Sequence, residues 1–238
     1  MTHWKLGRLP TKHDKRNIQF ADILLKPLKI PLDYDFDEKN PVPTPMFAND
    51  RFGDCVLAGR SHQTLRFELL EQKQLISISD KDVINEYFKE TGGADDGLVV
   101  LNSLNLWRKI GWKINRKTYK IKAYSQITPK DQELVRQAIY LNIGVGLGIS
   151  FPASAMTQFI KGQVWDVVNR TTIEGGHYVL CTGYNQVGPV CVTWGRKQQM
   201  TWAFWNKYAQ ECYTIIDARN TVGLNMNKLE ELLEKVTK

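Results

Sequence analysis

One cysteine and one histidine of this chain stand where a nucleophile and its base could act together. Cys55 follows a proline-rich stretch at 40–50 and directly precedes a run with helical spacing, and His177 begins a short β-type run. Backbone N–H groups and the helix dipole at a helix N-terminus favour a thiolate, and a nearby imidazolium lowers the pKa of a thiol further from about 8.5. The pair could therefore attack a carbonyl carbon.

The other histidines suit this chemistry less well. His3 and His13 lie in the N-terminal segment, and His62 lies seven residues along the expected helix from Cys55, about 10 Å away along its axis. Buried structural cysteines are common, and a core histidine with a backbone partner is commoner than a catalytic one. Residue type alone therefore does not separate a catalytic pair from a structural one.

Composition places the chain among ordinary globular proteins. Its 238 residues are 42% hydrophobic and 24% charged, enough to bury a core without disulfide or metal staples. The four cysteines, Cys55, Cys181, Cys191 and Cys212, form no C-x-x-C pair, so neither a disulfide framework nor a metal site is expected. Reduced thiols fit a cytoplasmic location, or a virion if the chain is phage-encoded, and no cofactor is implied.

Charge and hydropathy exclude two classes of partner. The net charge of +7 comes from scattered basic residues without a nucleic-acid-binding motif, so no nucleic acid is expected. No apolar run reaches the roughly 20 residues that cross a bilayer, and the N-terminus lacks a secretory layout, so no membrane is expected. The oligomeric state is not fixed by the sequence.

The elements that must position the pair change in character along the chain. Residues 1–29 form a polar, basic arm, and the region 50–117 has helical periodicity, with a Ser79–Asp82 capping pattern and a stop near Gly92-Gly93. From 118 to 217 the pattern is mostly that of strands, with one helix before a buried strand at 143–151. Residues 218–238 end in a short amphipathic helix, expected to dock on the domain's own surface. The sequence predicts an α+β chain in which a helix-rich half is followed by a sheet-rich half.

The residues around Cys55 and His177 carry a family resemblance. The stretch T-P-M-F-A-N at 44–49 leads to Cys55, and G-H-Y-V-L at 176–180 is followed by Gly183-Tyr184 and then by V-T-W-G at 192–195. In this order and over roughly residues 30–217, the sequence resembles papain-like (C1-type) cysteine peptidases. The resemblance implies a two-lobed papain-like fold, with a helical N-terminal lobe and a C-terminal lobe built from an antiparallel β-sheet or barrel, and a peptide or protein as substrate.

The resemblance also implies roles for particular residues. Cys55 would be the nucleophile and His177 the general base and acid, while Asn49 takes the place of the family's oxyanion-hole glutamine. Asn49 as a loop-capping residue is the alternative. On the substrate side, the resemblance implies Gly92 and Gly93 as the glycine pair of the cleft, with Gly176 and Trp194 near the pair.

One departure from the family pattern bears on catalysis. Val192 stands where the family has the asparagine that orients the imidazole, and valine has no acceptor. Thr193 can orient His177 only if a bulge turns its hydroxyl inward; a purely structural Thr193 is the alternative. Activity is then expected to weaken without vanishing, because the thiolate–imidazolium pair creates the nucleophile. An arm of about 29 residues is also too short for the usual folded propeptide, so self-inhibition of the usual kind is not expected.

Two classes of function follow from the sequence. The first is a cysteine peptidase that cleaves peptide or isopeptide bonds through an acyl-enzyme, with an amidase of cell-wall peptides and acyl transfer to an amine as variants. The second is a papain-fold pseudoenzyme that binds a partner or builds an assembly, for instance in a phage particle. Selective reactivity of Cys55 that depends on His177 separates the two.

Overall fold

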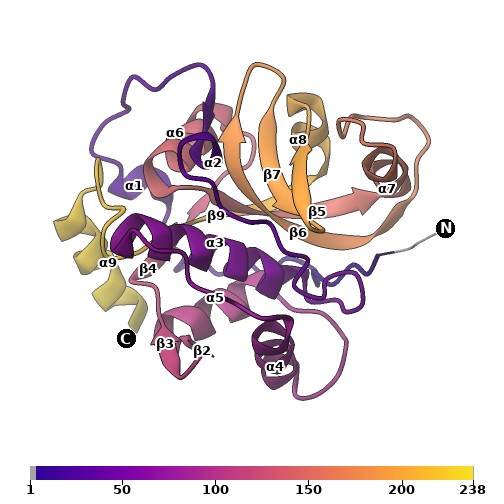
Figure 1. The fold of residues 1–238 in the computed structure, drawn as a ribbon. Helices are drawn as coiled ribbons and strands as arrows, with labels where there is room; N and C mark the ends of the chain where they lie inside the picture. Colours follow the sequence, from indigo (N-terminus) through magenta and orange to yellow (C-terminus); the bar gives the residue numbers. More distant parts are fainter. Residues whose placement is uncertain (1–3, 238) are drawn as a thin grey trace.

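The computed structural model describes residues 4–237, and the helical and sheet-rich parts pack against each other across the middle of the molecule (Figure 1). The helices are α1 (Phe20–Ile23), α2 (Phe36–Lys39), α3 (Cys55–Gln72), α4 (Asp80–Thr91), α5 (Val100–Lys109), α6 (Gln132–Asn142), α7 (Ala153–Ile160), α8 (Trp202–Tyr208) and α9 (Met226–Thr237). The strands are β1 (Tyr34–Asp35), β2 (Trp112–Ile114), β3 (Lys117–Tyr119), β4 (Ala123–Ile127), β5 (Val145–Pro152), β6 (Ile173–Tyr184), β7 (Pro189–Thr193), β8 (Arg196–Gln199) and β9 (Ala209–Ile216).

The main sheet has the order β4-β9-β5-β6-β7-β8, with β1 added to the end of β6, and its pairs are antiparallel. The predicted α+β class, with a helical N-terminal part and an antiparallel C-terminal part, is confirmed. Within residues 4–237, β4 and β8 end the strand order without pairing to each other, so the sheet is open and not a barrel. The twelve-residue β6 carries His177 through the centre of this sheet.

The two faces of the sheet bury different cores. Along β9, Cys212 and Ile216 join the core beneath α6, α7 and α8, whereas Tyr213 and Ile215 join the core shared with α3 and α5. Alternate residues of a strand point to opposite faces, which explains this division. The face of the sheet that packs against α3 and α5 is therefore lined by one alternate set of strand residues.

The ends of α4 follow from its sequence. Ser79 and Asp82 form the predicted capping box, in which each side chain accepts a hydrogen bond from the other's backbone N–H. The helix ends at Gly92, whose φ of 72° lies in the left-handed region that glycine adopts without a Cβ clash.

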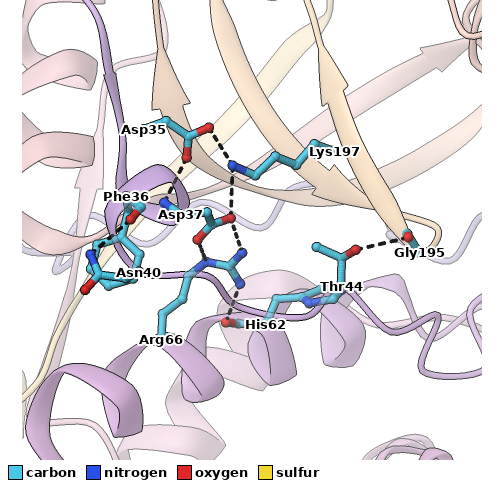
Figure 2. A network of polar contacts seen from close by, with 9 residues as sticks. All are labelled: Asp35, Phe36, Asp37, Asn40, Thr44, His62, Arg66, Gly195 and Lys197. Atoms are coloured by element: carbon cyan, nitrogen blue, oxygen red, sulfur yellow. Dashed lines mark hydrogen bonds and ion pairs between the residues drawn. The ribbon is translucent and has the colours of Figure 1, made fainter. Parts of the chain in front are cut away.

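A buried ion network ties α3 to the sheet (Figure 2). The guanidinium of Arg66 on α3 donates to both carboxylate oxygens of Asp37, at 2.9 and 2.6 Å, and the side chain of Arg66 is fully buried. Lys197 on β8 contacts Asp37 at 3.3 Å and Asp35 at 2.5 Å. The segment around α2 therefore joins the helix that begins at Cys55 to the edge of the sheet.

The terminal segments belong to the same packed body. Phe20 and Ile23 of the predicted N-terminal arm are fully buried in the sheet core, as is Leu229 of α9. The backbone N–H of Asn225 donates to the carbonyl of Ile23 at 2.7 Å, which ties the end of α1 to the start of α9. The tail thus docks on the domain's own surface, as its amphipathic pattern predicts.

Candidate active site

Cys55 is the first residue of α3 and follows the loop that the prolines at 41, 43 and 45 keep irregular. The loop is fixed to the sheet because the hydroxyl of Thr44 donates to the carbonyl of Gly195 at 3.0 Å (Figure 2). At the first position of a helix the backbone N–H has no intrahelical acceptor, so the N–H of Cys55 is available to an anion. The predicted position of Cys55 at a loop-to-helix junction is confirmed.

A glycine lets α3 approach β6 closely. A Cβ built on Gly59 would lie 2.5 Å from Cε1 of Tyr178, the residue after His177. The far side of the same ring is also restrained, because a Cβ at Gly146 on β5 would lie 1.7 Å from the Tyr178 hydroxyl. The ring of Tyr178 is held between α3 and β5, and this contact sets the distance between α3, which begins at Cys55, and β6.

His177 is fully buried, and its Nε2 atom lies 2.7 Å from Oγ1 of Thr193. The register of the β6–β7 pair explains this contact. Leu180 pairs with Val192, but the register shifts by one residue between Cys181 and Gly183. Without that shift Thr193 would oppose Leu180 and point to the other face of the sheet, because a slip of one residue reverses every side chain.

Trp194 covers the imidazole on one side. Its ring stacks on that of His177 with centroids 4.1 Å apart and planes 13° apart, while Phe151 meets the imidazole edge-on at 5.5 Å. Trp194 is only 4% exposed and has a φ of 43°, a left-handed turn conformation unusual for a tryptophan. The turn after β7 therefore places an aromatic ring that keeps water from the His177–Thr193 contact.

Asn49 lies close behind Cys55, and its amide is engaged. The Nδ2 atom donates to Oδ1 of Asp54 at 2.9 Å and to the carbonyl of Phe52 at 3.3 Å. Burial raises the pKa of Asp54 to about 8, an effect that the hydrogen bond from Asn49 partly offsets. In this structure Asn49 stabilises the loop, the alternative interpretation of its position, and Asn49 as oxyanion donor stays a prediction for an open state.

The structure places Gly92 and Gly93 at the end of α4, and their predicted role in substrate binding stays a prediction. Both have positive φ at the end of α4, and a Cβ on either would meet nothing within 4 Å. The helix needs them as its C-terminal cap. At Gly97 a Cβ would lie 2.3 Å from the carbonyl oxygen of Gly7, so the N-terminal arm approaches the chain closely at this glycine.

The N-terminal arm runs through the groove between the two lobes. Backbone N–H groups donate from Leu98 to the carbonyl of Gly7 at 2.8 Å, from Leu9 to Leu98 at 2.9 Å, and from Arg8 to Gly176 at 2.9 Å. Residues 7–9 thus bridge the helical part at Leu98 and the sheet at the residue before His177. A Cβ on Gly7 would lie 1.7 Å from the carbonyl oxygen of Gly53, so only glycine fits at this point of the arm. The arm, although expected to be too short for a folded propeptide of the usual kind, lies between the two lobes at residues 7–9.

The thiol and the imidazole are both neutral in this arrangement. Burial raises the pKa of Cys55 to about 12, and the nearby backbone N–H groups of Tyr178 and Gly7 lower this pKa by less than burial raises it. Burial, and then the nearby charge of Arg8, lower the pKa of His177 to about 3. Among the hydrogen bonds of residues 4–237, none joins Cys55 to His177, and the Nδ1 atom of His177 is buried without a partner. The sulfur lies beside the His177–Tyr178 peptide, and the ion pair is not formed while the arm is in place.

Four residues near the site, Gly7, Arg8, Leu98 and Glu211, were not predicted from the sequence. Arg8 forms a buried ion pair with Glu211 at 2.8 Å. One signal was available for Glu211, because it alternates with Tyr213 and Ile215 and so must share their buried face. For the arm no local signal exists, since an extended segment is positioned by its partners on other elements.

Two further classes of site are not built by the described part of the chain. Residues 4–237 contain no group of three or more His, Cys, Asp or Glu residues that could hold a metal ion. None of their helices is long and apolar enough to span a bilayer.

Comparison with known proteins gives matches in structure. No model of a known protein family matches the chain, and no curated protein does. Xylellain, a cysteine protease from Xylella fastidiosa, superimposes with a TM-score of 0.69 at 18% identity, over 91% of this chain and 97% of that one. The Carica candamarcensis cysteine protease CMS1MS2 gives 0.60 at 12% identity, over 80% and 100% of the two chains. The cysteine protease and lectin-like domains of Cwp84 from Clostridium difficile give 0.65 at 12% identity, over 88% and 55%. The chain has the fold of the papain-like cysteine proteases.

Proposed function

We propose that this protein is a thiol hydrolase that cleaves peptide or isopeptide bonds through an acyl-enzyme at Cys55. The observation that supports it most is the 2.7 Å contact between His177 and Thr193 beneath Trp194, beside a sulfur at a helix N-terminus. A purely structural histidine does not need an orienting hydroxyl, an aromatic cover and a neighbouring thiol at once.

The chemical steps follow from these positions. His177 accepts the thiol proton, the Cys55 sulfur bonds to the substrate's carbonyl carbon, and the carbonyl π electrons move to oxygen. The resulting oxyanion is stabilised by the backbone N–H of Cys55 at the helix N-terminus. When the oxyanion collapses, the C–N bond breaks and His177 returns the proton to the leaving amine. Water then adds to the thioester with His177 as base, and the sulfur leaves as the thiol.

The arm makes this form of the protein a latent one. The backbone N–H of Gly7 lies near the Cys55 sulfur, and the backbone N–H of Arg8 donates a hydrogen bond to the carbonyl of Gly176. A substrate needs the same groove, so the arm must move before the reaction begins. Displacement of the arm brings water to the thiol and the imidazole, which removes the desolvation that keeps both neutral.

A binding protein without catalysis is the second candidate, and the buried, neutral pair favours it. Turnover by a full-length Gly7→Ala variant separates the two, because the added Cβ would lie 1.7 Å from the Gly53 carbonyl oxygen and is expected to displace the arm. The proposal predicts cleavage of peptides from an unfolded protein mixture by this variant. Adding Cys55→Ala abolishes the cleavage, and adding His177→Ala reduces it about a thousandfold or more. Equal, background-level cleavage by all three variants supports the binding protein.

A further inference from the structure

One β-hairpin carries an excess of positive charge equal to that of the whole chain. Although lysines and arginines occur throughout the sequence, seven of the 32 lie within residues 108–122, a segment that includes no aspartate or glutamate. The remaining residues carry 25 basic and 25 acidic side chains, so their formal charges cancel. The net charge of +7 is therefore concentrated on β2, β3 and the residues that flank them, at the lower edge of the molecule in Figure 1.

Most of this charge is not neutralised by the protein itself. Lys117 pairs with Glu68 and Lys122 pairs with Glu230, both at 3.1 Å. Four further cations are exposed and have no ion-pair partner within residues 4–237, namely Lys109, Lys113, Arg116 and Lys120. Their charges are therefore available to an anionic partner.

The fold gathers these cations on the outer face of the hairpin. Trp112 of β2 is fully buried, so the alternation along the strand turns Lys113 outwards, together with its cross-strand partner Thr118. A Cβ at Gly111 would lie 2.9 Å from Cγ2 of Thr118 and 2.5 Å from Cγ of Lys120, so both side chains lie over this glycine. Lys113 and Lys120 therefore lie on the same face.

The tip of the hairpin presents an arginine at a position that favours glycine. The two residues of the turn, Asn115 and Arg116, have φ of 49° and 71°, as a two-residue type I′ turn requires. A side chain with a Cβ is less stable in this left-handed region than glycine. The side chain of Asn115 donates to the carbonyl of Ser77 at 3.2 Å, whereas the guanidinium of Arg116 has no hydrogen-bond partner within residues 4–237. Local strain of this kind is often found at functional sites.

Acidic side chains bound the positive strip on both sides. The cavity between the hairpin and α3 is lined by the carboxylates of Glu68, Glu71 and Asp217. The cleft between the hairpin and α4 is lined by Asp82 and Glu86. A broad anionic surface would meet these carboxylates as well as the cations, whereas a single extended chain can follow the strip between them.

The aromatic residues of the hairpin argue against two other anionic partners. Single-stranded nucleic acids stack their bases on exposed rings, but Trp112 is buried and the Nζ atom of Lys117 lies 4.7 Å from the ring centroid of Tyr119. Attachment to a membrane surface gains much of its strength from apolar side chains that enter the bilayer, and the turn Asn115-Arg116 offers none.

We propose that the outer face of this hairpin docks an acidic segment of a partner protein. The segment is an extended chain whose Asp and Glu carboxylates pair with Lys113, Arg116 and Lys120. The surface is separate from the catalytic groove, because Lys117 pairs with Glu68, which lies thirteen residues beyond Cys55 along α3, about 20 Å away. Docking at this distance does not require that the protein is a hydrolase.

Fluorescence anisotropy with a labelled acidic peptide tests this surface. The host is the full-length chain with Cys55→Ala, which cannot cleave the probe. The probe is a fluorescent peptide of about ten residues in which Glu and Ser alternate, and the control peptide carries Gln in place of Glu. At about 50 mM NaCl the Glu peptide is expected to bind at least about tenfold more tightly than the Gln peptide, and about 300 mM NaCl is expected to weaken it by screening.

Charge-removing variants locate the binding site. Lys113→Gln with Arg116→Gln is expected to weaken binding of the Glu peptide at least about tenfold. The matched control, Lys26→Gln with Lys29→Gln, removes the same charge from the exposed segment between α1 and β1, at the upper left of Figure 1 and away from the hairpin. This control is expected to change the affinity by less than about twofold. Equal weakening by both pairs, or no binding of the Glu peptide by the host, overturns the docking surface.

Arg116→Gly separates the arginine side chain from the turn that holds it. Glycine adopts the φ of 71° without strain, so this variant is expected to be at least as stable to urea as the host. It is nevertheless expected to bind the Glu peptide at least about threefold more weakly, and undiminished binding overturns the role of Arg116. Tighter binding of a DNA duplex, or of vesicles that contain phosphatidylserine, than of the Glu peptide overturns the choice of an acidic protein segment.

Discussion

The hydroxyl oxygen of Thr193 lies 2.7 Å from Nε2 of His177. In the peptidases that the sequence resembles, the orienting residue is an asparagine one residue earlier, at the position of Val192. A shift in strand register brings the threonine to the face of the histidine. The imidazole tautomer with its proton on Nε2 donates to Thr193 and leaves Nδ1 free to accept the proton of Cys55. A hydroxyl can thus replace an amide as the orienting group.

Removal of this hydroxyl is predicted to slow turnover. In the Gly7→Ala background, Thr193→Val keeps the shape but lacks the acceptor, and we expect kcat/KM to fall roughly three- to tenfold, as for one lost hydrogen bond. Thr193→Ser is the matched control and is expected to retain most of the activity. Equal activity of the Val and Ser variants means that the hydroxyl does not orient His177.

Gly59→Ala is predicted to destabilise the protein although alanine favours helices. The helix gains about 1 kcal/mol of propensity, but the new Cβ would lie 2.5 Å from the ring of Tyr178, and overpacking of this kind costs about 1–3 kcal/mol. Urea unfolding is expected to show a net loss of stability. Unchanged or increased stability shows that the ring of Tyr178 can move and does not set the position of α3.

The buried network in Figure 2 predicts a large effect of one substitution and a smaller effect of two. Arg66→Met leaves the carboxylate of Asp37 buried with Lys197 as its remaining cation, and we expect the free energy of unfolding to fall by about 3 kcal/mol. Arg66→Met with Asp37→Leu removes both charges and is expected to recover much of this loss. A double variant that is less stable than Arg66→Met alone contradicts this account.

Acid is predicted to destabilise the fold through His177. Burial, followed by the charge of Arg8, lowers the pKa of His177 to about 3 in the folded state, against an ordinary value of about 6.5 for histidine. The stability it contributes is therefore present above pH 6.5 and is lost as the pH falls towards 3, because the unfolded chain binds the proton first. Thermal unfolding at pH 7 and pH 4.5 is expected to show a smaller acid-induced decrease for His177→Gln than for the native chain. An identical decrease in both chains shows that His177 takes up its proton equally in the folded state.

The sequence predicted those features that depend on local pattern. The start of α3 at Cys55, the Ser79–Asp82 cap and the strand near 143–151 follow from capping residues and periodicity. Features set by long-range pairing were not predictable. The close contact of Gly7 with Gly53 joins residues more than 40 positions apart, and the Arg8–Glu211 pair joins residues 203 positions apart. A Gly-Gly pair can line a cleft or end a helix, so the motif alone does not separate the two roles, and here Gly92 ends α4.

Alkylation of Cys55 tests the central claim most directly. Iodoacetamide labelling at pH 7 is read residue by residue by mass spectrometry in the native chain, in Gly7→Ala and in Gly7→Ala/His177→Ala. We predict slow labelling of the native chain, because its thiol is buried beneath the arm. In Gly7→Ala, Cys55 is expected to react at least about tenfold faster than Cys181, Cys191 and Cys212, and His177→Ala is expected to remove that advantage. If expelling the arm leaves all four cysteines equally slow, or if the rate at Cys55 does not depend on His177, the account of a thiol hydrolase is contradicted.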